Sequence, residues 1–260
     1  NFIMVKAIDC DFSVEGNGPP LFLIHGIGAS RSAWRFLIPS LRDHFTIITY
    51  DLCGHGKSPH RVGEINLDHL VADLERVREI TKFEKAHFAG HSLGGMIAPA
   101  YARKFPNRVI SLGLLSTAAG RTPEDSSKVW GVIHEMEKVG VQKTLNNLVD
   151  RWFTDKFIRD YPDIVEQRIQ EVIAMDVEVF LNVFRIYAKT EMASWLHEIS
   201  IPSLVLTGEK DGGCNPRLNQ FIANTLPNSK LVVLSKYKHS LLLEAPTEVA
   251  RNLVEFMIPK

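Results

Sequence analysis

Short runs of apolar residues alternate, over the first 115 positions, with stretches whose apolar residues recur every three or four positions. The runs are typical of strands buried on both faces of a sheet, and they lie at 21–24, 45–50, 86–89 and 108–115. The stretches with helical spacing lie at 32–42, at 67–80 and from 93 onward. This order predicts an α/β protein with a mostly parallel sheet wrapped by helices.

Residues 2–14 combine apolar and β-branched residues in partial alternation, as in a strand with one exposed face. The Glu-Gly-Asn-Gly-Pro-Pro segment at 15–20 interrupts this alternation with turn-forming residues. We therefore predict a hairpin-like edge ahead of the main sheet.

The pattern changes after residue 119. Helical stretches without a convincing strand follow at 128–139, 141–153, 162–174 and 177–187. Strand patterns return at 203–207 and 230–234, each followed by a helical stretch, at 218–225 and 247–257. We predict a core domain formed by residues 1–120 and 196–260, with a helical lid, or cap, inserted at 121–195 between two halves of the sheet. Such a lid places a ligand pocket between itself and the strand ends.

Charge limits the classes of partner. The chain has 260 residues with 30 Lys+Arg and 30 Asp+Glu, so its formal net charge at pH 7 is +0. Without a net field the chain is not expected to recruit nucleic acid or an anionic membrane. We expect a small, roughly neutral substrate, and a homodimer stays open.

The cysteines and the start of the chain bear on the compartment. The sequence has three cysteines, Cys10, Cys53 and Cys214. Their odd number and wide spacing argue against a disulfide framework and against a cysteine-rich metal site. No stretch approaches the roughly 20 apolar residues of a membrane span, and the first residues lack the pattern of a signal peptide. We therefore expect a reducing, cytoplasmic location.

A serine between glycines ends the third apolar run, in the sequence Gly90-His91-Ser92-Leu93-Gly94. A serine at the apex of so tight a strand-to-helix turn leaves no room for a Cβ two positions to either side, and Gly90 and Gly94 supply that room. The N–H groups that begin the next helix point toward any anion formed near Ser92. Because G-x-S-x-G is expected by chance in about a tenth of chains this long, the motif needs partners elsewhere.

A serine hydroxyl is a weak nucleophile at neutral pH and needs a histidine base oriented by a carboxylate. The loop after 203–207 contains Glu209 and Asp211, and the loop after the last strand contains His239. The order Ser92, Asp211, His239 is typical of this arrangement, so we predict these three as the catalytic residues. Glu209 is the nearest rival for the acid. The remaining acid candidates are Asp150, Asp155 and Asp176.

Attack on an ester carbonyl creates an oxyanion that needs N–H donors. The first buried strand is followed by the loop His25-Gly26-Ile27-Gly28, which can direct the Ile27 N–H at this oxyanion. The Leu93 N–H is the second predicted donor. His25 is a candidate for the substrate pocket, although we favour a supporting role in its own loop because a backbone donor needs no side chain.

The other histidines of these loops suggest no further chemistry. His55 and His91 are expected to pack within loops, because with His25 they match no metal-ligand spacing. No phosphate loop or dinucleotide fingerprint occurs in the sequence. We therefore predict neither a metal nor a cofactor.

The predicted lid concentrates aromatic residues among its charges. Part of this set is expected to line an apolar pocket above Ser92, with Trp130, Trp152 and Phe153 as candidates. The alternative is that these residues pack lid helices against one another. The other aromatic residues considered are Phe157, Phe180 and Phe184.

Nearly the whole chain resembles the α/β-hydrolase superfamily. The motifs that carry the resemblance are HGIG at 25–28, DLCGHGKS at 51–58, GHSLGG at 90–95, GEKD at 208–211 and KHSLLLEAP at 238–246. Ser92 argues against the haloalkane dehalogenases and epoxide hydrolases of the superfamily, which have Asp at that position. GHSLGGMIA, RVISLGLLSTAA and Arg151-Trp152-Phe153-Thr154 are most similar to the 3-oxoadipate enol-lactonase and carboxylesterase group.

Two residues depart from that group. Lys238 stands where Gly is usual before the histidine, and Cys53 stands where Arg is frequent. Neither change removes a catalytic group, but the first affects the histidine loop.

The resemblance and the predicted site together imply a cofactor-free serine hydrolase of carboxylic esters or enol-lactones that acts through an acyl-serine. One alternative is a C–C bond hydrolase of ring-cleavage diketones. Another is a small-molecule receptor that keeps the three residues and turns over slowly.

Overall fold

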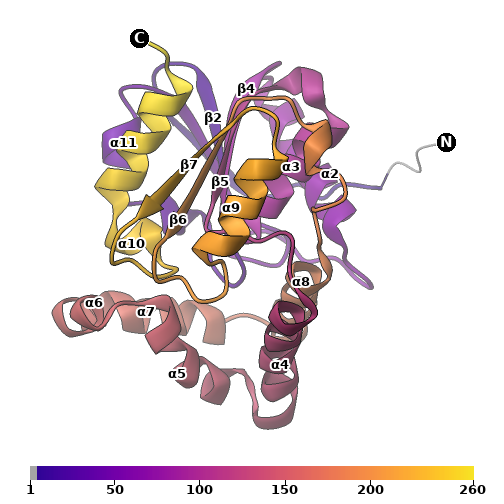
Figure 1. Ribbon diagram of the computed structural model, residues 1–260. Coiled ribbons are helices and arrows are strands. Elements are labelled where there is room, and N and C mark those ends of the chain that lie inside the picture. Colours follow the sequence, from indigo (N-terminus) through magenta and orange to yellow (C-terminus); the bar gives the residue numbers. More distant parts are fainter. Residues whose placement is uncertain (1–4) are drawn as a thin grey trace.

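The computed structural model describes residues 5–260, whose strands form one seven-stranded sheet (Figure 1). The strands are β1 (Phe12–Gly16), β2 (Pro20–Ile24), β3 (Thr46–Tyr50), β4 (Ala86–His91), β5 (Val109–Leu115), β6 (Ser203–Gly208) and β7 (Ser229–Leu234). They lie in the order β1-β3-β2-β4-β5-β6-β7, and every neighbouring pair is parallel except β1 and β3. The predicted mostly parallel sheet is confirmed.

Helices occupy most connections between the strands. Around the sheet they are α1 (Ile38–Leu41), α2 (Leu67–Thr81), α3 (Gly94–Lys104), α9 (Pro216–Thr225), α10 (Leu241–Glu244) and α11 (Pro246–Met257). Short 3-10 helices are η1 (Arg31–Trp34), η2 (Pro106–Arg108) and η3 (Leu196–Glu198). Between β5 and β6 the chain forms α4 (Pro123–Val139), α5 (Val141–Trp152), α6 (Asp155–Asp160), α7 (Pro162–Ile173) and α8 (Val177–Lys189). Figure 1 shows α4–α8 gathered below the sheet.

The inner strands β2–β6 bury both of their faces. On β2, Phe22 and Ile24 enter one hydrophobic cluster while Leu21 and Leu23 enter another, because successive side chains of a strand point to opposite faces. Residues of α2, α3 and α9 complete the first cluster, and residues of α1 and α11 complete the second. Burial on both faces explains why the strands read as continuous apolar runs.

β1 does not form the predicted hairpin with β2. It pairs antiparallel with β3, which lies between β1 and β2. The connection crosses the start of β3 so closely that a Cβ at Gly16 would lie 2.3 Å from the Phe45 carbonyl oxygen, and one at Gly18 2.3 Å from that of His44. The prediction was wrong because these two glycines let the chain pass close to the start of β3, instead of turning directly back into a paired strand. Residues 2–4 of the predicted edge lie outside the described residues.

Proline and capping residues explain where the helices differ from the predicted ones. The expected helix at 32–42 is divided, since η1 ends at Trp34 and α1 begins at Ile38 with Pro39 in its first turn. The sequence pattern missed α6, a six-residue helix capped by Thr154. Pro162 then begins α7, where the missing proline N–H costs no hydrogen bond because the first N–H groups of a helix have no partner within it.

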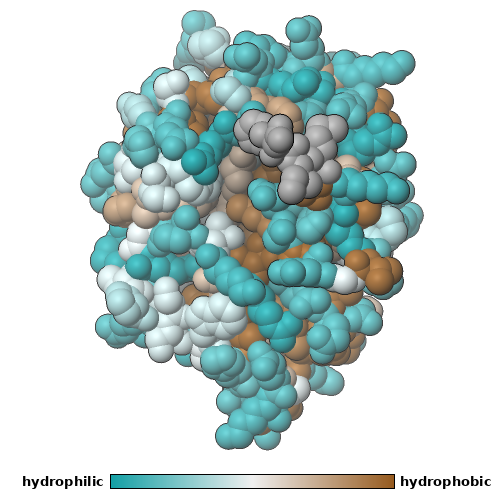
Figure 2. Space-filling model, turned by 90° about the vertical axis from the view of Figure 1, so that its right-hand side faces the viewer, coloured by the Kyte–Doolittle hydropathy of each residue, from teal (hydrophilic) through white to brown (hydrophobic). Residues whose placement is uncertain are grey.

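Figure 2 shows the face of the molecule seen from the right of Figure 1, where hydrophilic residues predominate and apolar residues gather in a band near the middle. No helix of residues 5–260 is both long and apolar enough to cross a membrane.

Candidate active site

Ser92 lies at the turn between β4 and α3 in a strained backbone conformation. Its φ is +57°, in the left-handed region that few residues other than glycine adopt. The flanking glycines are sterically required: a Cβ at Gly90 would lie 1.9 Å from the Gly94 carbonyl oxygen, and one at Gly94 2.1 Å from that of Ile24. The Ser92 N–H donates to the Leu115 carbonyl at 2.8 Å, which fixes the turn against β5. The predicted strand, sharp turn and helix are therefore present.

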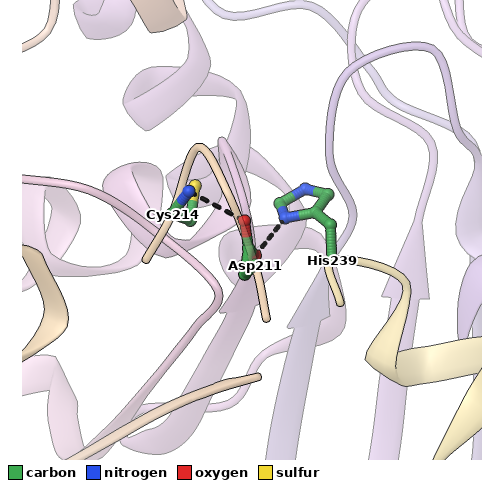
Figure 3. Close-up of side chains that lie close together, drawn as sticks. All are labelled: Asp211, Cys214 and His239. Carbon is green, nitrogen blue, oxygen red and sulfur yellow. Dashed lines mark hydrogen bonds and ion pairs between the residues drawn. The ribbon is translucent and has the colours of Figure 1, made fainter. Parts of the chain in front are cut away.

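Asp211 and His239 lie in the loops that follow β6 and β7, and the structure brings their side chains together (Figure 3). The distance from His239 Nδ1 to Asp211 Oδ2 is 2.6 Å. The other carboxylate oxygen accepts from the N–H groups of Cys214 at 2.8 Å and Gly213 at 3.2 Å. The buried Asp211 carboxylate is thus held on both of its oxygens.

The electrostatics of this pair favour its charged form. Burial raises the pKa of the Asp211 carboxyl, but the facing His239 ring and the hydrogen bonds outweigh burial and leave the pKa below its usual value. Burial lowers the pKa of His239, and the Asp211 carboxylate more than reverses that effect, so this pKa lies well above its usual value. Because a carboxylate only accepts, it keeps a proton on Nδ1 in both forms of the ring, so that Nε2 is the acceptor whenever the ring is neutral.

Ser92 and His239 border the same cavity, although among the described residues no hydrogen bond joins the Ser92 hydroxyl to the His239 ring. The rival Glu209 is exposed and accepts from the Lys236 N–H at 3.2 Å instead of contacting His239. The other acid candidates, Asp150, Asp155 and Asp176, are all exposed residues of the α4–α8 region.

The N–H groups of Ile27 and Leu93 have no acceptor among the described residues. A Cβ at Gly26 would be 3.8 Å from Ser92 Oγ, so the loop after β2 lies against the serine. Within residues 5–260, neither the Ile27 N–H nor the Leu93 N–H donates to any oxygen or ring nitrogen. Leu93 is the N-cap residue of α3, where N–H groups have no partner inside the helix. Both predicted donors are therefore available to an anion.

Two buried histidines support the loop that carries Ile27. His25 Nε2 accepts from the Leu52 N–H at 2.9 Å, and His55 Nε2 accepts from the Gly28 N–H at 3.0 Å. Their Nδ1 atoms donate to carbonyl oxygens of their own loops. His25 is fully buried and does not border the cavity, so its candidacy for the substrate pocket was wrong and the supporting role is what the structure has.

Acid should destabilise the fold through these two rings. Burial holds the pKa of His25 well below 6.5 and that of His55 at about 4, whereas in the unfolded chain both return to about 6.5. The unfolded chain therefore binds more protons below about pH 6.5, and stability is lost as the pH falls from there toward 4. At 1.36 kcal/mol per pKa unit, His55 accounts for up to about 3 kcal/mol. Urea unfolding at several pH values should show that the free energy of unfolding falls less steeply with decreasing pH in His55→Gln than in wild type or in the control His44→Gln. Equal slopes would show that His55 does not contribute to the acid sensitivity.

Arg168 of α7 holds the same loop from the opposite side. Its Nη1 donates to the Gly28 carbonyl at 2.7 Å and its Nη2 to the Ile27 carbonyl at 3.0 Å. Glu171, three residues on in the same helix, pairs with Arg168 at 3.3 Å and accepts from the Ser30 hydroxyl at 3.0 Å. Sequence reasoning missed Arg168, because its only signal was a place in a predicted lid helix.

The cavity that Ser92 and His239 border has a volume of about 1130 Å³. Residues of α4, α5, α7 and α8 supply much of its wall. Aromatic side chains on this wall are Trp152, Phe180, Phe184 and Tyr187.

Two predicted pocket residues lie elsewhere. Phe153 is fully buried and stacks on Phe157 in a separate hydrophobic cluster of this region. Trp130 packs beside His134 on α4 and does not border the cavity. These two assignments were wrong, while Trp152 does line the cavity. Phe153 follows the last residue of α5 with an extended backbone, and on α4 it is Val129 and Gly131, on either side of Trp130, that border the cavity.

The loop that carries His239 is tied to α5. The Lys238 ammonium donates to the Asp150 carbonyl, and the Ser240 N–H donates to the Trp152 carbonyl at 3.0 Å. Lys238, which replaces the glycine usual before the histidine, thus forms one of the links between this loop and the α4–α8 region.

Comparison with known proteins agrees with this architecture. A family model described as the alpha/beta hydrolase fold matches residues 19–165. The chain is 28% identical over 221 residues to 3-oxoadipate enol-lactonase 2 of Acinetobacter baylyi, a match that covers 85% of this chain and 82% of that protein. Its fold is similar to that of the enol-lactonase from Burkholderia xenovorans LB400, with a TM-score of 0.88 at 22% identity over 95% and 96% of the chains. A malate-bound thermophilic esterase from Thermogutta terrifontis has a TM-score of 0.86 at 27% identity over 96% and 93%.

Proposed function

Because the chain belongs to the alpha/beta hydrolase fold family, we propose that it is a serine hydrolase that cleaves carboxylic esters or lactones without a cofactor. Family membership and the named lactonases and esterase support a hydrolytic enzyme. The observation that carries the ester or lactone proposal is a single cavity bordered by Ser92, Ile27 and His239, with the Asp211 carboxylate on His239 Nδ1.

In the proposed reaction, His239 Nε2 takes the hydroxyl proton as Ser92 Oγ attacks the substrate carbonyl. The carbonyl oxygen becomes an oxyanion that accepts from the N–H groups of Ile27 and Leu93. The C–O bond then breaks, and His239 returns the proton to the departing alcohol or enol oxygen, which leaves an acyl-Ser92. Water, activated by His239 in the same way, hydrolyses the acyl group to a carboxylic acid and restores the serine.

We propose that helices α4–α8 act as a lid that selects the substrate, since α4, α5, α7 and α8 supply much of the wall of the cavity that Ser92 borders. The cavity also borders Arg35 and Arg151, so substrates with a carboxylate belong among the candidates beside uncharged ones. The names of two relatives, an oxoadipate lactonase and a malate-bound esterase, include dicarboxylates and support that choice.

The proposal is tested with a panel of short and long acyl esters, neutral lactones, an enol-lactone that bears a carboxylate, and a dienoic ring-cleavage diketone. We expect ester or lactone cleavage to a carboxylic acid and no cleavage of the diketone. Cleavage of the diketone alone would identify a C–C bond hydrolase. Tight binding with less than about one turnover per minute on every substrate would identify a receptor, because typical enzymes turn over at roughly 10 per second.

Trp152→Ala should change substrate preference more than stability, because the indole lines the cavity and is not fully buried. We expect the ratio of kcat/KM between short and long acyl esters to change by about tenfold, the effect of one to two methylenes in an apolar pocket. Trp130→Ala is the matched control, since Trp130 is a tryptophan of the same region that does not border the cavity. A large fall in melting temperature with an unchanged profile would place Trp152 in the core instead.

Arg168→Met should lower kcat about 10- to 100-fold, less than the loss of an oxyanion donor itself, because the Ile27 loop loses two hydrogen bonds. KM should change by less than about threefold if Arg168 positions the loop and does not bind substrate. Arg168→Lys, which keeps a charged donor, should recover part of kcat, while the exposed Arg159→Met should have no effect. A rise in KM alone would show that Arg168 binds substrate.

A further inference from the structure

The loops after β6 and β7 bring three different metal-ligand types together at one side of the cavity. One carboxylate oxygen of Asp211, the Cys214 Sγ and one ring nitrogen of His239 all lie within 4.8 Å of one another (Figure 3). All three residues border the cavity that contains Ser92, so a small ion has a path to them. Asp211 and Cys214 are buried, which limits competition by water.

Neighbouring groups orient these ligands. The Asp211 carboxylate is held by the N–H groups of Gly213 and Cys214, and the Tyr187 hydroxyl contacts the Cys214 Sγ at 3.0 Å. Outer contacts of this kind fix the orientation of metal ligands in proteins and affect metal affinity.

We propose that Asp211, Cys214 and His239 form an inhibitory site for a soft divalent cation such as Zn²⁺ or Cd²⁺. Thiolate, imidazole and carboxylate together suit these ions and not Mg²⁺ or Ca²⁺, which prefer oxygen ligands. With Zn–S near 2.3 Å and Zn–N or Zn–O near 2.1 Å, ligand atoms of a tetrahedral site are about 3.4–3.6 Å apart. The present distances reach that range with side-chain shifts of about 1 Å.

Occupation of the site stops the reaction by changing which nitrogen of the His239 ring carries the proton. The cation replaces the proton of the Cys214 thiol, which goes to solvent, and it binds His239 Nδ1 in place of the proton held toward Asp211. The neutral ring then carries its proton on Nε2, the atom that must accept the Ser92 proton in the proposed function. This inhibitory effect rests on the proposed function. The binding of the ion does not, since it needs only the three ligand groups.

The test titrates the purified full chain with Cd²⁺ and follows the ultraviolet charge-transfer band of the cadmium thiolate. We expect one equivalent per chain in wild type, and inhibition of hydrolysis over the same range, reversed by a chelator. Cys214→Ser should lose the band, and His239→Gln should weaken binding at least about tenfold. Cys53→Ser is the matched control, since Cys53 is also buried but lies in another loop, and it should keep the band.

A band that survives in Cys214→Ser, or one that is equally strong in wild type, His239→Gln and Asp211→Asn, would overturn the site. If Cys214→Ser does not fold, the cadmium-113 NMR shift of the wild-type complex is measured instead, since it reports the number of sulfur ligands. One sulfur ligand would support the site, and none would contradict it. Since the band does not depend on turnover, failure of the proposed hydrolysis and failure of this site give different results.

Discussion

Ser92→Ala is expected to lower kcat for ester or lactone cleavage by several orders of magnitude, with the fold preserved. The hydroxyl supplies the bond-forming electron pair, and removal of a nucleophile from such a catalytic group leaves only the contribution of binding and the oxyanion donors. The fold should survive because the Ser92 backbone, and not its hydroxyl, forms the hydrogen bonds to Leu115 and Thr117. Steady-state kinetics and circular dichroism of the variant measure the two effects.

His239→Ala should be about as damaging, and the double variant should lose little more than either single one, because the two residues act as a unit. Losses that add in the double variant would mean that Ser92 and His239 do not cooperate. Near-wild-type activity of Ser92→Ala, with contaminating activity excluded by a separate preparation, would reject the assignment of the nucleophile.

Asp211→Asn should lower kcat by roughly 10³ to 10⁴ at neutral pH. The carboxylate accepts from His239 Nδ1 at 2.6 Å, and an asparagine amide in its place removes the charge and can donate to the ring, which favours the wrong tautomer. The buried carboxylate also stabilises the imidazolium that forms when Ser92 gives up its proton. The kinetics of the purified variant are compared with those of Glu209→Gln.

Glu209→Gln is the matched control, because Glu209 lies two residues away, is exposed and does not contact His239. Its kcat should stay within about threefold of wild type, less than 1 kcal/mol of transition-state stabilisation. The reverse ranking of the two variants would move the acid to Glu209. Mild effects of both would turn attention to Asp150, Asp155 and Asp176.

The sheet could be predicted because its inner strands are buried on both faces and therefore appear as apolar runs, as at 21–24 and 86–89. The turn at Ser92 could be predicted because its close backbone contacts tolerate only glycine at positions 90 and 94. Local sequence dictates both features. The approach of Asp211 to His239 could also be predicted, because the two residues follow the last two strand patterns of the chain, in the order Ser92, Asp211, His239 that is typical of this arrangement.

Other features depend on which distant segments pack together. Nothing local in the segment 15–20 distinguishes a hairpin from the crossing that places β3 beside β1. Trp152 and Phe153 are neighbours in sequence, yet Trp152 lines the cavity and Phe153 is buried. The helix α5 ends between them, so the two side chains point in different directions. Contacts such as Arg168 with the Ile27 loop, or Cys214 near His239, join residues that no spacing rule connects.

Rapid mixing with an activated ester, followed by acid quench and peptide mass spectrometry, detects the proposed acyl-Ser92 intermediate itself. We expect a burst of about one equivalent of alcohol per chain and an acyl group on the peptide that contains Ser92. Ser92→Ala should show neither. Turnover of the same ester by wild type without a burst or an adduct at Ser92, or with the acyl group on another residue, would rule out an acyl-Ser92 intermediate.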